Sequence, residues 1–307
     1  MLAATTAHAA GGNALSWTTL GTAAGPVLSA ERSQPANLLL VDGKPWLVDC
    51  GDGALERLAA AGFRAAQVET VYISHLHMDH IGGLQALLGL RWMQSASTVL
   101  TIYGPPGTDA VVAGLVQSLK PVSLIEGGKT NRMSPDQLVK VVIVDDGDDR
   151  TLGGVRVRAV RNSHFDDEPG HPADNGTESL SYRFDYQGRA IGYTGDTGPS
   201  DAVARLEQGV DVLVSEVIDL GPVVANLDRA MSSMPPKARE ALINHLKTQH
   251  LTPRDAGTMA SQAGARHLVF THLGIVGATD STAPKLVSEA QITYSGPVSV
   301  AHDLDTF

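Results

Sequence analysis

The chain of 307 residues contains one cysteine, few aromatic residues and no excess of positive charge. Cys50 alone cannot form an intramolecular disulfide or a thiolate zinc cluster, so any metal would need histidine and carboxylate ligands. No run reaches the roughly 20 apolar residues of a membrane span. Lys and Arg number 23 against 33 Asp and Glu, for a net charge of −10. Because phosphate binding needs a basic patch, this balance disfavours nucleic acid as a partner.

Apolar residues are abundant, at 43% of the chain, and the chain contains 11 histidines. The apolar fraction and the length predict a globular protein with a sizeable core. Residues 1–14 are predicted to be a disordered tail or the remnant of a leader peptide, because Ala7-His8-Ala9 resembles a cleavage region. This favours a periplasmic or secreted location, with a cytoplasmic location as the alternative. Residues 15–307 are predicted to form a single domain.

Strand and helix patterns alternate along this domain. Two strands are expected around the Asp42-Gly43 turn, and another over Val68–Ser74. The segment His164–Gly176 lacks periodicity and is expected to be a loop. Helices are expected over Lys237–Lys247 and over residues 253–263. The alternation predicts one mixed α/β domain, built of two packed sheets or of a large sheet covered by helices.

The strongest chemical signal is the sequence His75-Leu76-His77-Met78-Asp79-His80, directly after the expected strand. Four potential ligands within six residues can turn toward one point. Imidazole and carboxylate suit zinc, and also iron or manganese, whereas the lack of thiolates excludes sulfur-rich sites. A lone histidine is usually an ordinary surface or core residue, but this combination predicts a metal centre.

This motif resembles the HxHxDH signature of the metallo-β-lactamase superfamily. The resemblance extends to four further segments, which are Leu47–Gly53, Asn162-Ser163-His164, Gly195-Asp196-Thr197 and Phe270-Thr271-His272-Leu273. It implies a four-layer αββα sandwich with two metals at the edges of the sheets. It also implies that Asp49 supports the metal loop.

Carried over position by position, the resemblance implies a complete set of metal ligands. The first metal would be held by His75, His77 and His164, and the second by Asp79, His80 and His272, with Asp196 between them. Two Zn²⁺ ions are expected, with Mn²⁺ or Fe as alternatives. Two cations in such a pair acidify water at neutral pH.

Within the superfamily, the chain resembles the ribonuclease Z and arylsulfatase-like branch. The segments that carry this likeness are Leu20–Pro26, Ser179–Phe184, Ser215-Glu216 and His250-Leu251-Thr252. In that branch a glutamate and a histidine matching Glu216 and His250 act as a pair. A carboxylate that orients an imidazole would let His250 give a proton to an alkoxide or phenoxide leaving group. Asp79, His250 and Glu216 are therefore the candidate catalytic residues.

The chain departs from this branch in the interval between His164 and Asp196. Members that process tRNA carry a long RNA-gripping arm there, and this interval has no room for one. With the acidic balance, this argues against tRNA as the substrate. The site is expected to be covered instead by Phe165–Gly176 and by Leu220–Pro236. In the second segment Leu227, Met231 and Met234 could form an apolar wall, or they could equally be the core contacts of an irregular helix.

The leading hypothesis is therefore a dinuclear zinc hydrolase that cleaves a small-molecule ester, whether a phosphodiester, a sulfate ester or a carboxylic ester. An alternative is a ring-opening hydrolase of the lactonase or β-lactamase type, because it would use the same ligand set. A further alternative is a non-catalytic metal-binding scaffold of the same fold, or a redox di-iron member. Retention of all seven expected ligands argues against loss of the metal.

Overall fold

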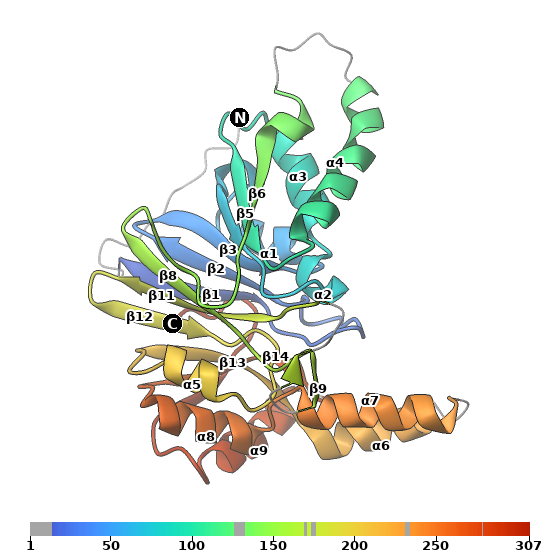
Figure 1. Ribbon diagram of the computed structural model, residues 1–307, viewed down its shortest axis with the longest axis vertical. Coiled ribbons are helices and arrows are strands. Elements are labelled where there is room, and N and C mark those ends of the chain that lie inside the picture. The colour runs from blue at the N-terminus through green and yellow to red at the C-terminus, as the bar shows by residue number, and fades with distance from the viewer. Residues whose placement is uncertain (1–13, 126–132, 169–170, 173–175, 231–233, 278) are drawn as a thin grey trace.

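A computed structural model describes residues 14–125, 133–168, 171–172, 176–230, 234–277 and 279–307. The expected tail lies almost wholly outside these residues, so the division into a tail over 1–14 and one domain over 15–307 stays a prediction. Within the described part, two β-sheets face each other and helices lie on both outer faces (Figure 1). The predicted four-layer αββα sandwich is thus confirmed.

The first sheet has the strand order β1-β2-β3-β4-β5-β6. Pairing is antiparallel from β1 to β3 and parallel from β3 to β6. Its strands are β1 (Leu15–Gly21), β2 (Ala36–Val41), β3 (Lys44–Cys50), β4 (Thr70–Tyr72), β5 (Leu100–Gly104) and β6 (Val139–Ile143). The helical segments that belong to this half are α1 (Ala54–Ala60), η1 (Ala65–Gln67), α2 (Met78–Ile81), α3 (Leu84–Met93), α4 (Thr108–Ile125) and η2 (Pro135–Leu138).

The second sheet has the order β15-β14-β13-β12-β11-β8-β7, parallel from β15 to β12 and antiparallel beyond. Its strands are β7 (Asp149–Leu152), β8 (Val155–Arg161), β11 (Leu180–Tyr186), β12 (Arg189–Tyr193), β13 (Val212–Ile218), β14 (Leu268–Gly274) and β15 (Val298–Val300). Its outer face carries α5 (Asp201–Leu206), α8 (Pro253–Ala263) and α9 (Thr279–Ala290). Two short strands, β9 (Asp166–Glu168) and β10 (His171–Pro172), pair inside the segment expected to be a loop.

The core between the sheets is apolar and aromatic. Trp17 of β1 packs against Tyr193 of β12, with ring centroids 5.4 Å apart, and Tyr72 of β4 stacks on Tyr103 at 4.7 Å. The indole nitrogen of Trp17 donates to Asn37 Oδ1 at 3.2 Å, which satisfies its buried polar atom. Two further apolar clusters join each sheet to its own helices. The strand ends that carry the polar motifs therefore rest on a close-packed frame.

The expected hairpin around Asp42-Gly43 is present, with β2 and β3 in register from Val41 opposite Lys44. Asp42 and Gly43 have φ of 48° and 75°, the left-handed values that a two-residue type I′ turn requires.

The segment 220–236, expected to cover the site, is mostly helical where the structure describes it. It contains α6 (Leu220–Ala230), which pairs with α7 (Pro236–Thr248) in a hairpin that projects from the body of the molecule (Figure 1). Met231 of the expected apolar wall lies outside the described residues, and Leu227 lies on α6. None of the helices that the structure describes is long and apolar enough to cross a membrane.

Candidate metal centre

The His75–His80 loop follows β4 and turns back at once toward the sheets. His77 has an extended conformation and caps the single turn α2, where its carbonyl accepts from the amide of His80 at 3.0 Å. This turn directs Asp79 and His80 inward, while Met78 is 71% exposed. His75 and His80 are fully buried.

Three more predicted residues reach the same point from the second sheet. His164 follows β8, Asp196 follows β12, and His272 lies on β14. The carboxyl ends of these strands share one edge of the sheet, because β12, β13 and β14 are parallel and β8 runs in the same direction. That edge meets the first sheet where the amide of Leu180 donates to the carbonyl of Ser74 at 2.9 Å.

The seven predicted ligands form two groups around Asp196. The first group holds His75, His77, His164 and Asp196, and the second holds Asp79, His80 and His272, with the ligand atoms of each group within 4.8 Å of one another. Asp196 Oδ2 lies 3.8 Å from His75 Nε2 and 3.1 Å from His272 Nε2. Its Oδ1 lies 3.3 Å from His80 Nε2. The carboxylate of Asp196 thus lies between the two groups, as the sequence predicts.

The chemistry of these atoms fits bound cations. His77 Nδ1 lies 3.0 Å from His75 Nε2 and 3.2 Å from His164 Nε2, so three ring nitrogens converge. Buried atoms that make no hydrogen bond include His80 Nε2, Asp196 Oδ1 and His272 Nε2. Unpaired buried polar atoms are costly, and a metal ion would satisfy all three. A set of imidazole and carboxylate ligands suits zinc, iron or manganese.

Asp49, at the end of β3, supports the loop as expected. Its Oδ2 accepts from His80 Nδ1 at 2.8 Å and from the Tyr193 hydroxyl at 2.7 Å, and its Oδ1 accepts from the amide of Ser74 at 2.7 Å. These bonds fix the tautomer of His80 and turn its Nε2 toward the cluster. Asp49 has φ of 58° and His272 has φ of 42°, left-handed values that cost about 1–3 kcal/mol each and often mark functional sites.

Two glycines allow the close approach of Asp79. The amide of Gly25 donates to Asp79 Oδ2 at 2.9 Å, and a Cβ at Gly25 would lie 2.4 Å from that carboxylate. A Cβ at Gly51 would lie 2.1 Å from the backbone oxygen of Asp79. Any side chain at either position would displace Asp79, so both positions require glycine.

Burial and charge set the protonation of the cluster. Burial lowers the pKa of His75 and of His164 well below the ordinary value, which keeps these rings neutral and their lone pairs available. Burial acts to raise the pKa of Asp196, but His272 and His80 outweigh it and hold that pKa well below its usual range. The first group thus presents neutral imidazoles beside a carboxylate, the forms in which both bind metals. In the second group, burial acts to lower the pKa of His80 and of His272, but the Asp196 carboxylate outweighs it and raises both above the ordinary value.

Glu216 and His250 form the predicted pair at the margin of the cluster. His250 Nδ1 donates to Glu216 Oε2 at 2.6 Å, and the amide of Thr197 donates to Glu216 Oε1 at 2.5 Å. Both side chains are buried. Burial acts to lower the pKa of His250, yet the Glu216 carboxylate raises it above the ordinary value. A histidine held in this way can carry a proton at neutral pH.

The structure also adds residues that the sequence reasoning missed. His245, near the end of α7, has its ring 5.4 Å from that of His164 and 5.2 Å from that of His250. The carbonyl of Gln249 accepts from His164 Nδ1 at 3.0 Å, which orients a predicted ligand. Both residues lie at or just beyond the end of a helix that the sequence predicts, but the sequence carries no signal that this helix ends beside His164.

Phe165 borders the first group, as expected of the segment after His164. Its ring lies 4.7 Å from that of His164, 5.1 Å from that of His77 and 5.6 Å from that of His75. The half-buried ring of Phe165 is therefore an apolar border on one side of the first group.

Residues 44–273 match the family described as the beta-lactamase superfamily domain. The chain belongs to the metallo-β-lactamase superfamily. A ribonuclease Z of Mycobacterium avium (strain 104) is 31% identical over 258 residues, covering 83% of this chain and 84% of that protein. Within the superfamily, the chain therefore belongs with the ribonuclease Z relatives, and it is a metal-dependent hydrolase.

Solved structures give the same fold at lower identity. The metallo-beta-lactamase fold protein YhfI from Bacillus subtilis has a TM-score of 0.70 at 21% identity. The alignment covers 95% of this chain and 98% of YhfI. Human tRNase Z, short form, has a TM-score of 0.62 at 23% identity, and the alignment covers 95% of this chain and 98% of that protein.

The relatives overturn two expectations. The prediction of a small-molecule ester substrate was wrong, and so was the prediction that nucleic acid is an unlikely partner, because the curated relatives that cover most of the chain are named as ribonucleases. The physical error was to treat the net charge of −10 as a property of the whole surface. A sum over the chain does not report how charge is distributed, and phosphate binding depends on local patches.

Proposed function

We propose that this protein is a dinuclear zinc phosphodiesterase that hydrolyses RNA, the activity that the name of its ribonuclease Z relatives indicates. The observation that carries the proposal is the pair of ligand groups that share Asp196, in a chain that aligns with those relatives over most of its length. Zn²⁺ fits the ligands best, and Mn²⁺ or Fe would be accepted by the same atoms. An RNA substrate favours a cytoplasmic location over export.

The ligands are assigned by group. His75, His77 and His164 would hold the first ion, Asp79, His80 and His272 the second, and Asp196 both. Two divalent ions supply Lewis acidity toward a phosphate oxygen and lower the pKa of water. Asp79 Oδ2 accepts a hydrogen bond from the amide of Gly25, and this bond fixes the orientation of the carboxylate.

The protein residues then handle binding and the proton. Asp79 orients the attacking water by accepting a hydrogen bond. His250 donates a proton to the ribose oxygen that leaves phosphorus, from the ring nitrogen that does not contact Glu216. Glu216 is the positioning residue, since it holds the ring and raises the pKa of His250.

The test uses protein stripped by a chelator and reloaded with Zn²⁺. Reloaded protein should cleave a tRNA precursor that carries extra 3′ nucleotides, and stripped protein should not. Asp196→Ala should abolish cleavage and lower the bound zinc. His267→Ala, one residue before β14 and so at the opposite end of this strand from His272, should change neither. Elemental analysis gives the zinc content independently of activity.

Two results would contradict the proposal in different ways. Hydrolysis of bis(4-nitrophenyl) phosphate without cleavage of any RNA would keep the phosphodiesterase and remove RNA as its substrate. Less than one metal ion per chain after reloading would remove the metal centre itself.

A further inference from the structure

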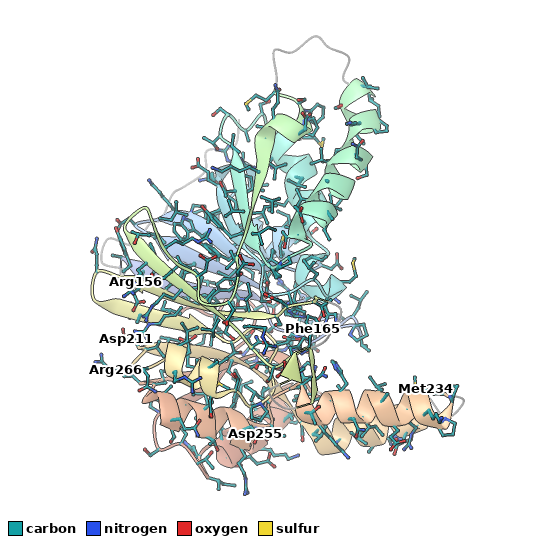
Figure 2. All side chains as sticks on the ribbon, in the orientation of Figure 1. Arg156, Phe165, Asp211, Met234, Asp255 and Arg266 are labelled. Carbon is teal, nitrogen blue, oxygen red and sulfur yellow. The ribbon has the colours of Figure 1, made fainter. Side chains whose placement is uncertain are left out.

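His245 is a half-buried histidine beside the proposed proton donor, and the proposed function gives it no task. Helix α7 runs from the outer end of the α6–α7 hairpin, near which Met234 lies (Figure 2), to an inner end at the candidate metal centre. His245 lies in the last turn of this helix. Its ring centroid is 5.2 Å from that of His250 and 5.4 Å from that of His164. One ring nitrogen of each of these three histidines lies within 4.8 Å of the others.

The hydrogen bonds of Gln249 fix which nitrogen of His245 carries the proton. The side-chain nitrogen of Gln249 donates to the backbone carbonyl of Asp166 at 2.7 Å. Since that carbonyl can only accept, the orientation of the Gln249 amide is settled, and its side-chain oxygen faces His245. There it accepts a hydrogen bond from His245 Nδ1. With the proton on Nδ1, the Nε2 of the neutral ring carries a lone pair and is a hydrogen-bond acceptor.

The Nε2 atoms of His245 and His250 are both open to a ligand. Glu216 accepts from His250 Nδ1, so the Nε2 of His250 is the proton donor of the proposed reaction. Among the residues that the structure describes, neither Nε2 has a hydrogen-bond partner. Neither is among the buried polar atoms that lack a partner, so both reach solvent. The site thus offers a donor and an acceptor on neighbouring rings.

An acceptor at this place selects against phosphate and in favour of a donor. Phosphate oxygens carry only lone pairs, so His245 Nε2 would repel them, whereas a hydroxyl group can donate to it. In the proposed reaction, His250 protonates the 3′-oxygen of the leaving ribose. The hydroxyl group closest to that oxygen is the 2′-hydroxyl on the adjacent carbon of the same sugar. This is the group that distinguishes RNA from DNA.

We infer that His245 Nε2 accepts a hydrogen bond from the 2′-hydroxyl of the ribose whose 3′-oxygen leaves, and that His245 thereby makes the site specific for RNA over DNA. This inference rests on the proposed function and names the chemical group that the site recognises. The neighbouring rings of His250 and His245 hold the two neighbouring oxygens of one sugar. Gln249 is the positioning residue, since its side chain sets the tautomer of His245 while its carbonyl accepts from His164 Nδ1 at 3.0 Å.

The first test changes one hydroxyl group of the substrate. A 3′-extended tRNA precursor is compared with the same RNA carrying a single 2′-deoxyribose at the nucleotide that supplies the leaving 3′-oxygen. Wild-type kcat/KM should be about tenfold lower for the deoxy substrate, the size of one hydrogen bond. His245→Asn keeps an amide that can donate to Gln249 but lacks Nε2, so this variant should cleave both substrates equally. Asn244→Ala, at an exposed position of the same helix, should retain the wild-type preference.

The ratio of the two rates separates recognition from structure. Both substrates meet the same protein preparation, so a loss of folding or of metal lowers both rates and leaves their ratio unchanged. A preference that persists in His245→Asn would therefore overturn the inference, and so would equal rates in the wild type. A ratio that changes with the base of that nucleotide would assign His245 to a base amino group and also overturn it. Zinc content should be the same in His245→Asn as in the wild type, and a lower content would make His245 a metal ligand instead.

Binding measured without cleavage distinguishes this inference from the proposed function. The probes are two uridine dinucleotides with a phosphorothioate link that resists cleavage, one with a ribose and one with a 2′-deoxyribose on the 3′-oxygen side. By titration calorimetry, zinc-loaded wild type should bind the ribose form about tenfold more tightly, and His245→Asn should bind both forms equally. This preference without cleavage of any RNA would refute the proposed function and keep the inference. Cleavage of RNA with equal wild-type binding of the two probes would keep the function and refute the inference.

Discussion

Glu216 Oε2 accepts a hydrogen bond from His250 Nδ1 at 2.6 Å, and both side chains are buried beside the histidine cluster. The other carboxylate oxygen of Glu216 is held by the amide of Thr197, one residue after Asp196. The segment Asp196-Thr197 therefore positions two carboxylates. One is that of Asp196, between the two ligand groups, and the other is that of Glu216, which holds His250. The other ring nitrogen of His250 remains available to donate a proton to a substrate.

Replacement of His250 should reveal its role through the leaving group. In His250→Ala, kcat should fall by about 10²–10⁴ for RNA, whose ribose oxygen leaves as a poor leaving group and needs a proton. For bis(4-nitrophenyl) phosphate the loss should be far smaller, because nitrophenolate leaves without protonation. Steady-state kinetics on both substrates measures the difference. Equal losses would show that His250 acts on binding or on the metals instead.

Asp49→Asn should weaken metal retention. Asparagine tolerates the left-handed backbone of this position, so the change removes the negative charge behind His80 with little strain. Loss of a partner of this kind typically costs 10–100-fold in metal affinity. Competition with a graded series of chelators, followed by elemental analysis, measures the change. Tyr193→Phe, which removes only one of the bonds to Asp49, should give a smaller loss.

Much of the fold and the site could be predicted from local signals. The Asp42-Gly43 pair predicts the hairpin between β2 and β3, because Asp-Gly favours a type I′ turn. The HxHxDH motif predicts a metal site, because it contains four potential ligands within six residues. His164, Asp196 and His272 carry weak signals alone, and the resemblance to a family supplied their grouping. The structure brings them together because each lies on or just after a strand of the second sheet, on one edge.

The sequence predicts α7 as a helix over Lys237–Lys247, but it does not predict α6 or the hairpin that the two helices form. Proline disfavours a helix interior, yet Pro222 and Pro236 each lie in the first turn of a helix, where the missing N–H has no intrahelical partner to lose. His245 lies within the predicted helix, but the sequence does not show that this helix ends at the site. Its proximity to His164 depends on how the hairpin is anchored, and no spacing in the sequence encodes that contact.

Arg91 is a buried structural residue whose loss should destabilise the fold. Its guanidinium donates to the carbonyls of Ala65, Val68 and Thr98, and the residue is 1% exposed. Arg91→Leu would leave these buried carbonyls without partners and should lower the free energy of unfolding by about 3 kcal/mol. Urea denaturation measures the change. Arg254→Leu, an exposed arginine on α8, should stay within about 0.5 kcal/mol of the wild type.

Glu207 should make the stability depend on pH. Its side chain is fully buried at the end of α5, and neither carboxylate oxygen has a hydrogen-bond partner. It packs so closely on β12 that a Cβ at Gly192 would lie 2.0 Å from Glu207 Oε2. Burial raises the pKa of Glu207 well above its ordinary value, against a weaker opposite effect of Arg183.

The sign of the effect follows from this direction. Because the folded pKa is raised, the folded state holds its proton where the unfolded state has already lost it, and stability falls as pH rises above about 4.5. Glu207→Gln keeps the shape of the neutral acid and removes this loss. Its free energy of unfolding, relative to the wild type, should therefore grow between pH 5 and pH 8, by up to about 1.4 kcal/mol per pH unit. Other titrating groups cancel in this difference, so an identical difference at pH 5 and pH 8 in urea denaturation would show that Glu207 is ionised in the fold.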